Sequence, residues 1–594
     1  MSLLLHFAVV AELSRAPSFD VPIVDEASYD QLARDLVAGR GLDGRLFWQG
    51  LLYPLELALV YAATGGSIVC ARVAQSFAGA AAAGLTCKLG ERVGGRRVGL
   101  AAGLLVACSG PLLFLDFELA ATAWEVLWGV ALPLLAMRAA ERSSARSAWL
   151  FGAACGAGIL TRAAFAPFTL AAIAWLAWSG SGRRERRWAR AATSAMGVAT
   201  VLLPAVLLAR SATGEWRILP YSGAINLYIG NGQGSDDRIR IRPGEAWDRL
   251  ASQPARRGAA TPSAKEAYFV DLVERDAVDH PGAFALGLAK KAVELVSSRE
   301  IPRNLDVYTY RAYSAVLEVA AWRAGPFGFP FGLVFPFALV GLVFAYRAMP
   351  APLVILLVTY SLSIVAVFVT ARYRAPILPA IAIAAAMGAR RAYDAVAARE
   401  WPVVAGCGAL ALSGAALSTR PGPFAAELGD PRAEMLTLVA TEHFEHGRFD
   451  DAESLLHEAL DGDPRDQVAH CVLGSVLARR GDLDGAADHF ASALALDSGS
   501  TVPQVPFHAN AGMGSVLVLR GTPSLALPYF REALKYEPDD ARLLDDVGQI
   551  LHGAGDDEGA ARYLRRAVFA DPSLDVARKN LERVEAALRG RAAP

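Results

Sequence analysis

The apolar residues of this chain gather in windows that contain almost no charge. Windows of up to about 22 residues are long enough to cross a hydrocarbon core as a helix. They predict a polytopic bundle of membrane-spanning helices over residues 67–87, 98–115, 119–137, 191–209, 327–346, 352–369, 377–387 and 401–417. A further window, 149–178, fits two short spans hinged near Thr161 and Arg162. Residues 1–13 are apolar but too few to cross, and we expect the true start of the first span to lie upstream.

The composition and the distribution of charge agree with a membrane protein. Hydrophobic residues make up 54% of the chain and its mean hydropathy is +0.31, which is too apolar for a typical soluble enzyme. Arginine and lysine gather in alternate short loops, which the positive-inside rule assigns to the cytoplasm; these loops are 88–97, 138–146, 183–190, 347 and 390–399. This pattern predicts that the loops around Asp25, around Asp116, from 210 to 325 and at 372–374 lie outside, with everything after Leu417.

The C-terminal part of the chain has a different pattern, with an internal repeat. Gly447 and Gly481 are 34 residues apart, and so are Gly521 and Gly555. A helix-turn-helix repeat of this length is the tetratricopeptide signature. We therefore predict a membrane domain over 1–419, a linker over 420–432 and a tetratricopeptide α-solenoid over 433–594, with an insertion near 498–508 and a capping helix at 574–588. A solenoid surface of this kind predicts a protein partner.

An acidic pair, Asp25 and Glu26, follows the first apolar segment and begins a predicted helix. Acidic residues near a helix N-terminus are stabilised by the helix dipole, which is a sufficient structural reason for the pair. The pair also lies at the predicted external face of the membrane, where further motifs follow in a fixed order: VDEASYDQLARDLVAGRG, GLLYPLELALVYAATG, FLDFELAATAWEVL, GILTRAAFAP, LPYSGAINLYIGNGQG and FVTARYRAPILPAIAIAAA.

These motifs, over roughly residues 21–387, resemble the integral-membrane GT-C glycosyltransferases, in particular the branch that contains protein O-mannosyltransferases, aminoarabinose transferases and the Rgt-like bacterial enzymes. The resemblance implies an all-α transmembrane bundle that takes a sugar from a polyprenyl-phosphate carrier and transfers it, with inversion, to an acceptor on the outer face. It implies that Asp25 is the catalytic general base, with Glu26 as its neighbour.

The same resemblance suggests roles for further residues. Asp116 and Glu118 correspond to an acidic position that orients the acceptor or binds a divalent metal, although interfacial acids at the end of a span explain them equally well. The leaving phosphate needs cations, which Arg372, Arg374 and Arg162 can supply beside Tyr373; interfacial anchoring is the alternative. Asn226 and Asn231 belong to a loop that borders the cavity.

The sequence thus predicts a membrane glycosyltransferase of a bacterial inner membrane, with the active site and the repeats on the extracytoplasmic side. Its expected partners are a polyprenyl-phosphate sugar, membrane lipid and a protein bound by the repeats, with no sign of nucleic acid binding. No cofactor is assigned, and a divalent metal stays open. Two alternatives remain: an enzyme similar to O-antigen ligases or polymerases, and a non-enzymatic membrane scaffold that displays the repeats.

Overall fold

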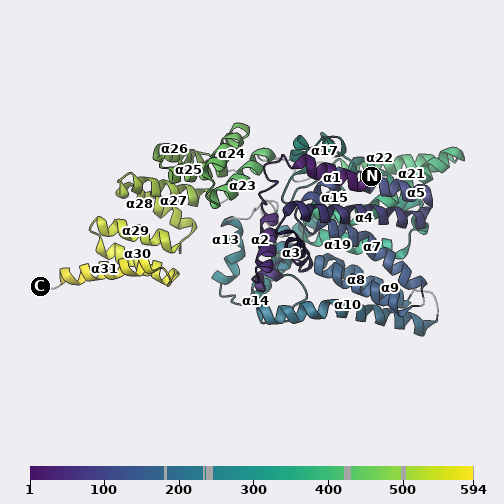
Figure 1. The fold of residues 1–594 in the computed structure, drawn as a ribbon, viewed down its shortest axis with the longest axis horizontal. Coiled ribbons are helices and arrows are strands. Elements are labelled where there is room, and N and C mark those ends of the chain that lie inside the picture. The colour runs from purple at the N-terminus through teal and green to yellow at the C-terminus, as the bar shows by residue number, and fades with distance from the viewer. Residues whose placement is uncertain are drawn as a thin grey trace. The chain divides into compact units, whose positions relative to one another are not determined.

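The computed structural model describes residues 1–142, 144–178, 183–231, 234–235, 245–420, 430–496 and 504–592. The chain folds into two compact units, one formed by Met1–Arg240 with Ala251–Ala426 and the other by Ile241–Leu250 with Glu427–Pro594. Both are helical (Figure 1). In the described part the only sheet is a hairpin of two short antiparallel strands, β1 (Trp322–Ala324) and β2 (Phe327–Phe329). Most of the predicted linker, 420–432, falls outside the described residues.

The first unit, here called the membrane unit, is a bundle of helices of unequal length. Four of its described helices are long and apolar enough to cross a membrane: α4 (Ile68–Gly94), α7 (Thr122–Glu141), α10 (Arg184–Thr213) and α22 (Trp401–Ser418). The pair α5 (Arg96–Ala107) and α6 (Gly110–Phe117), bent by 51°, makes a fifth if it is one span. The other apolar helices are α1 (Ser2–Leu13), α3 (Leu52–Thr64), α8 (Ala145–Thr161), α9 (Ala166–Trp178), α18 (Phe331–Phe344), α19 (Ala351–Val367) and α21 (Leu378–Ala397).

Several predicted spans have different bounds in the structure: 191–209 lies within the longer helix α10, and 98–115 is divided between α5 and α6. The window 327–346 begins with strand β2, and its helix starts only at Phe331. Helix α21 continues past residue 387 through Arg390 and Arg391 to Ala397, because helical hydrogen bonding does not depend on whether a side chain is apolar. The predicted break at Thr161 and Arg162 is present, since α8 ends at Thr161 and Arg162 has an extended backbone.

The segment between α10 and α18, which the sequence predicts to be external, is also mainly helical where it is described. It contains α11 (Ser222–Gly230), α13 (Glu245–Arg256), α14 (Pro262–Asp279) and α15 (Pro281–Leu295), followed by α16 (Val307–Tyr310) and α17 (Ala315–Ala320). A break at His280 and Pro281 separates α14 from α15. The helix predicted at Asp25 is α2 (Asp25–Val37), and Arg372 lies on the short helix α20 (Ala371–Arg374).

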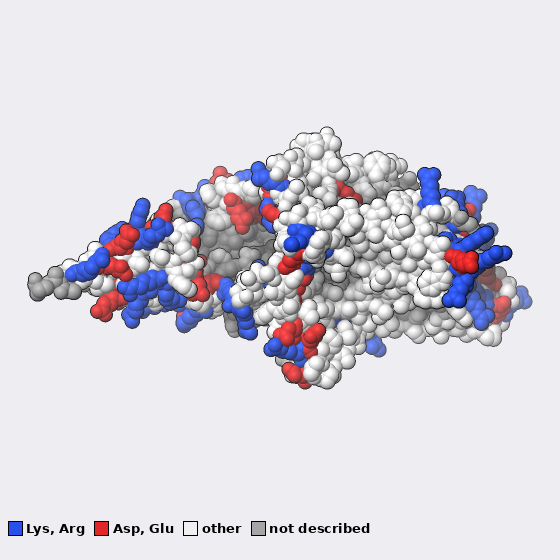
Figure 2. Space-filling model, turned by 90° about the horizontal axis from the view of Figure 1, so that it is seen from below, with Lys and Arg blue, Asp and Glu red and all other residues white. Residues whose placement is uncertain are grey.

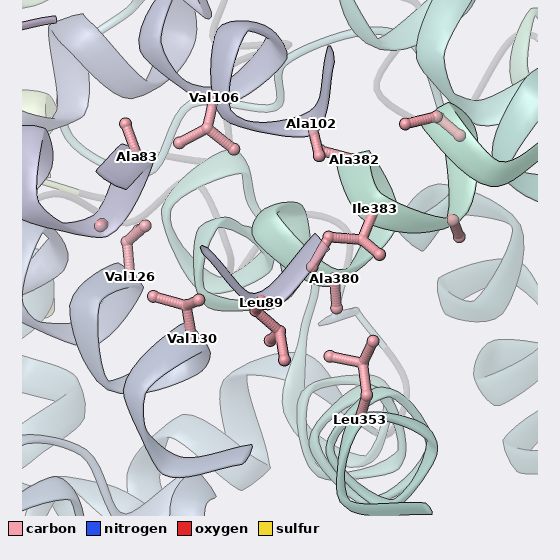
Figure 3. Packing of buried hydrophobic residues seen from close by; sticks show 14 of the residues in the cluster. Ala83, Leu89, Ala102, Val106, Val126, Val130, Leu353, Ala380, Ala382 and Ile383 are labelled. Atoms are coloured by element: carbon pink, nitrogen blue, oxygen red, sulfur yellow. The ribbon is translucent and has the colours of Figure 1, made fainter. Parts of the chain in front are cut away.

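One cluster in the core of the membrane unit consists mainly of aliphatic side chains, many of them alanine. Figure 3 shows residues of α4, α5, α7, α19 and α21 in contact, most of them alanine, valine or isoleucine. Glycine allows the closest approaches: a Cβ on Gly129 of α7 would lie 1.9 Å from the carbonyl oxygen of Pro376, and one on Gly341 of α18 would lie 1.9 Å from that of Ala384. Small residues at helix crossings are typical of membrane bundles, in which helices associate by close packing.

Charge is distributed unevenly over the surface of the membrane unit. Figure 2 shows a broad face of this unit almost without charged side chains, with lysine and arginine gathered at one end. In Figure 1 helices α5 and α21 reach that end. Each contains part of a basic segment that the sequence predicts as a loop, 88–97 for α5 and 390–399 for α21. This grouping agrees with the alternation of basic loops, and the side of the membrane on which the end lies stays a prediction.

The second unit, here called the repeat unit, consists of helix pairs. The pairs are α23 (Pro431–Glu445) with α24 (Phe449–Gly462), α25 (Gln467–Arg480) with α26 (Leu483–Ala495), α27 (Gln504–Leu519) with α28 (Pro523–Tyr536), and α29 (Ala541–Gly553) with α30 (Asp557–Ala570), followed by α31 (Asp575–Ala592). Gly447, Gly481, Gly521 and Gly555 join the helices of the four pairs with φ between 74° and 89°, a conformation that favours glycine. Helix α31 corresponds to the predicted cap, and much of the predicted insertion lies outside the described residues.

Candidate active site

Asp25 begins helix α2 and joins three distant segments of the membrane unit. Its Oδ2 accepts hydrogen bonds from Arg372 Nη1 at 2.9 Å and from Asn304 Nδ2 at 3.1 Å. Its Oδ1 accepts a longer bond, 3.5 Å, from Gln49 Nε2. The side chain is 24% exposed. One carboxylate oxygen therefore has two short hydrogen bonds, and the other has a single longer one.

The backbone directly before Asp25 is strained. Val24 has φ of 58°, in a region that a β-branched residue rarely adopts. Such a conformation costs on the order of 1–3 kcal/mol and persists only where the surroundings enforce it. Here Ile23 and Val24 are both buried, so that packing of these two side chains fixes the direction in which the chain enters α2 and presents Asp25.

Arg372 is held in place by the segments on either side of it. Its own helix, α20, begins with Thr370, whose side chain accepts a hydrogen bond from the backbone N–H of Tyr373. The N–H of Ala371 donates to the carbonyl of Ile301 at 2.8 Å. Ile301 lies just before Arg303 and Asn304, so this backbone contact joins the two segments that supply the polar partners of Asp25.

A cavity lies beside this cluster. Arg372, Arg303, Asn304, Glu118 and Glu300 contribute polar groups to its wall. Its apolar wall is formed by Pro111, Phe114, Leu115, Pro302, Leu305, Val307 and Ala371. The wall of the cavity thus combines two arginine side chains with an apolar surface.

The pKa values of Asp25 and Glu26 are shifted in opposite directions. Burial raises the pKa of Asp25, but the charges of Arg372 and Arg303 and the hydrogen bond from Asn304 lower it more, so that the pKa lies below its usual value. Glu26 is only 1% exposed, and burial raises its pKa in spite of the charge of Arg72 and the hydrogen bond from Leu119. The environment therefore favours the ionised form of Asp25 and disfavours that of Glu26.

Glu26 supports the acidic loop that follows α6. Its Oε1 accepts the backbone N–H of Leu119 at 2.9 Å. Two polar residues of α4 hold the same loop: Gln75 donates to the carbonyls of Asp116 and Glu118 at 2.8 and 2.6 Å, and Arg72 donates to that of Phe117 at 3.2 Å. These contacts position Glu118 at the cavity.

Asp116 and Glu118 point to different places. Asp116 Oδ2 and His6 Nε2 share a hydrogen bond of 2.8 Å, and Asp116 is buried between α1 and α4, where a Cβ on Gly79 would clash with it. Glu118, in contrast, lines the cavity. The two acids therefore do not converge on one metal ion, and no group of three or more His, Cys, Asp or Glu side chains in the described part of the chain has the arrangement of a metal site.

The other two arginines predicted to bind phosphate have partners within the protein. Arg374 pairs with Glu300 at 2.8 Å, donates to the carbonyl of Ser297 and packs on the ring of Phe331. Arg162 pairs with Glu125 at 2.7 Å, and its guanidinium lies 4.2 Å from the ring centre of Tyr373. Neither lines the cavity, and their contacts position α20.

The two predicted cavity asparagines are also separated from the cavity. Asn226 is a half-buried residue within α11. Asn231 ends this helix, and its Oδ1 accepts a hydrogen bond from Lys291 Nζ at 2.7 Å, while Lys291 also donates to the carbonyls of Gly230 and Val367 at 3.0 Å each. This contact ties the end of α11 to the end of α19, shortly before the segment that carries Arg372.

The sequence interpretation missed several residues of this site. Asn304 and Arg303 lie in an irregular segment without periodicity, and only the fold brings them to Asp25. A signal was available for Arg72, Gln75 and Glu125, because polar residues inside apolar spans usually have a specific partner. The described geometry thus defines the class of protein. It is a polytopic membrane protein that has a cavity lined by acidic and arginine side chains, together with a helical repeat unit.

Comparisons with known proteins refine this class. Residues 49–208 match the family described as dolichyl-phosphate-mannose-protein mannosyltransferase. This stretch includes Asp116, Glu118 and Arg162, and lies between Asp25 and Arg372. Residues 439–501 and 512–575 match the tetratricopeptide repeat family. The protein is therefore similar to membrane glycosyltransferases over part of its membrane unit, and its repeat unit consists of tetratricopeptide repeats.

Several solved structures are similar to part of this chain. MamA 41-end from Desulfovibrio magneticus RS-1 is 21% identical, with coverage of 27% of this chain and 98% of that chain and a TM-score of 0.22. YrrB, described as a TPR protein with an unusual peptide-binding site, is 22% identical, with coverage of 28% and 79% and a TM-score of 0.24. A comparison with curated proteins returned no match.

Proposed function

We propose that this protein is a membrane glycosyltransferase that moves a sugar from a polyprenyl-phosphate carrier to an acceptor hydroxyl on the extracytoplasmic face of a bacterial inner membrane. The observation that carries the proposal is the meeting of Asp25, Arg372 and Asn304 beside a cavity that has both guanidinium groups and an apolar wall. The partial match to mannosyltransferases supports the same class of reaction.

In this proposal Asp25 is the general base. The acceptor hydroxyl attacks the anomeric carbon, the bond from that carbon to the phosphate oxygen breaks with its electron pair on the oxygen, and the hydroxyl proton passes to Asp25 Oδ1. The lowered pKa of Asp25 makes it a weak base. It therefore takes the proton late, once the forming bond to carbon has made the hydroxyl acidic. Direct displacement of this kind inverts the anomeric centre.

The cavity wall suggests how the donor binds. Arg303 and Arg372 supply positive charge for the phosphate, and the charge that develops on the leaving oxygen strengthens this contact in the transition state. Phe114 and Leu115 supply an apolar surface for the first part of the carrier chain. Arg372 has a second role, because its bond to Asp25 couples the position of the base to that of the phosphate.

The repeat unit has a separate role in the proposal. Tetratricopeptide solenoids expose an extended binding surface, and we assign this one to docking of a protein acceptor or an assembly partner. Its extracytoplasmic location follows from the alternation of basic loops.

The test is substitution of Asp25 by Asn in the full-length protein. We expect sugar transfer from a radiolabelled polyprenyl-phosphate sugar, measured in membranes, to fall by about a hundredfold or more, since general-base catalysis contributes about that much. Asp20→Asn is the matched control, because Asp20 is an exposed acid shortly before the site. Undiminished transfer by Asp25→Asn would show that Asp25 is not the base, and a wild-type protein that transfers no sugar would favour the scaffold alternative.

A further inference from the structure

Glu118 is the acid that faces the cavity most directly. It follows the last residue of α6, its side chain is almost fully buried, and it lines the cavity. Its backbone carbonyl accepts a hydrogen bond from Gln75 of α4 at 2.6 Å. The backbone that carries this carboxyl group is therefore fixed beside the cavity, which suits a group that contacts a substrate.

Charged groups from several elements lie near Glu118. Asp25 and Glu26 of α2 are both acidic, and Arg372 is bonded to Asp25 at 2.9 Å. Arg72 of α4 affects Glu26 and donates to the carbonyl of Phe117. Glu300 and Arg303 line the same cavity, with Glu300 paired with Arg374 at 2.8 Å, and Tyr310 is a further titratable neighbour.

These surroundings disfavour a negative charge on Glu118. Burial has the largest effect, the neighbouring Glu26 and Asp25 add to it, and the charge of Arg372 offsets only part, so that the pKa of Glu118 is raised to about 8. At neutral pH the group is then mostly a carboxylic acid. A neutral carboxyl group donates a hydrogen bond through its O–H, whereas an ionised one only accepts.

We propose that Glu118 acts as a neutral acid whose O–H donates a hydrogen bond to a phosphoryl oxygen of the sugar donor in this cavity, and that it is not a metal ligand. The inference rests on the proposed function. It agrees with three of the other polar groups of the wall, because Arg303, Arg372 and Asn304 carry donors, while the carboxylate of Glu300 is paired with Arg374. An ionised carboxylate in the same place would repel the phosphate.

The proton of Glu118 stays on its oxygen throughout the reaction. When the bond between the anomeric carbon and the phosphate oxygen breaks, the phosphate gains negative charge, and the hydrogen bond from Glu118 becomes stronger. This differential effect lowers the barrier. The proton that must leave the acceptor hydroxyl still goes to Asp25, so the two acids have different protonation states and different roles.

The test compares Glu118→Gln, which keeps a neutral donor, with Glu118→Ala, which removes it, in the full-length protein. We expect Glu118→Gln to retain transfer at neutral pH within about fivefold, and Glu118→Ala to lose a hundredfold or more, the usual effect of removing one such donor. The wild-type rate should fall as the pH rises through about 8, and Glu118→Gln should lack this decline. Loss of transfer by Glu118→Gln equal to that of Glu118→Ala overturns the proposal, because a carboxylate is then required.

A second measurement does not depend on transfer. We expect decaprenyl phosphate to bind the wild-type protein about tenfold more weakly at pH 9 than at pH 7, beyond any change seen for Glu118→Gln. The infrared difference spectrum between the wild type and Glu118→Gln should contain a carboxylic acid C=O band of the wild type that titrates in the same pH range. A Glu118 that is ionised at pH 7 overturns the inference even if the wild type transfers no sugar, whereas absence of transfer with these signals present contradicts only the proposed function.

Discussion

The ion pair between Glu125 and Arg162 allows a prediction that connects the fold to the site. Glu125 of α7 is 1% exposed, and Arg162 at the end of α8 is 18% exposed. Their side chains are 2.7 Å apart, and the guanidinium of Arg162 lies 4.2 Å from the ring centre of Tyr373, the residue after Arg372. Three segments that are distant in the sequence therefore depend on this pair.

Substitution of Glu125 by Ala leaves the guanidinium of Arg162 without its partner. Breaking a buried ion pair from one side costs about 3–5 kcal/mol. We expect a value near 3 kcal/mol, since Arg162 keeps its contact with Tyr373 and is partly reached by water. Substitution of Arg162 by Met should cost less, because Glu125 can take up a proton and become neutral, whereas a guanidinium stays charged.

The assay compares the free energies of unfolding of these variants of the full-length protein in mixed micelles, measured by titration with a denaturing detergent. The double variant Glu125→Leu with Arg162→Met should be close to the wild type in stability, because well-packed apolar side chains commonly replace a buried pair at little cost. If Glu125→Ala and the double variant are equally stable, the pair does not have the role assigned to it. Transfer should fall in Glu125→Ala more than in the double variant, since an unpartnered Arg162 disturbs Tyr373 and hence Arg372.

Two further predictions concern the base and the repeats. In Arg372→Gln the loss of a positive charge beside Asp25 raises the pKa of this carboxyl group, because burial then has less to oppose it. Since Asp25 must be ionised to act, the acid limb of the pH profile of transfer should move to higher pH. An acid limb that does not move between pH 4 and 8 would contradict this coupling. In the repeat unit, a Cβ on Gly514 would lie 2.3 Å from Cε1 of Phe530. Gly514→Ala should therefore lower the free energy of unfolding of the repeats by about 1–3 kcal/mol. The assay is the protease resistance of the repeats in the full-length protein. Gly553→Ala is the control, as a Cβ there meets no atom within 4 Å, and equal resistance of both variants would refute the steric argument.

Local sequence patterns were sufficient for the elements of both units. The apolar windows predicted most membrane helices, the break at Arg162 followed from a charged residue within an apolar stretch, and the period between glycines predicted the helix pairs of the repeat unit. These features depend on residues close together in the chain, whose hydrogen bonding and periodicity can be read directly. The strand at Phe327–Phe329 was not foreseen, because a short apolar run does not distinguish a strand from the start of a helix.

The composition of the candidate site was decided by tertiary structure. The sequence suggested Asp25, Glu118 and Arg372 as members of one site, but it also grouped Asp116, Arg374 and Arg162 with them, and these three have partners elsewhere. Asn304 was not predicted at all, although it lies 279 residues from Asp25 in the chain and donates a hydrogen bond to it. Residue type and motif order determine which side chains are capable of the chemistry. Which of them face the same cavity depends on the packing of helices that are far apart in sequence, and that packing is set by side-chain shape rather than by local pattern.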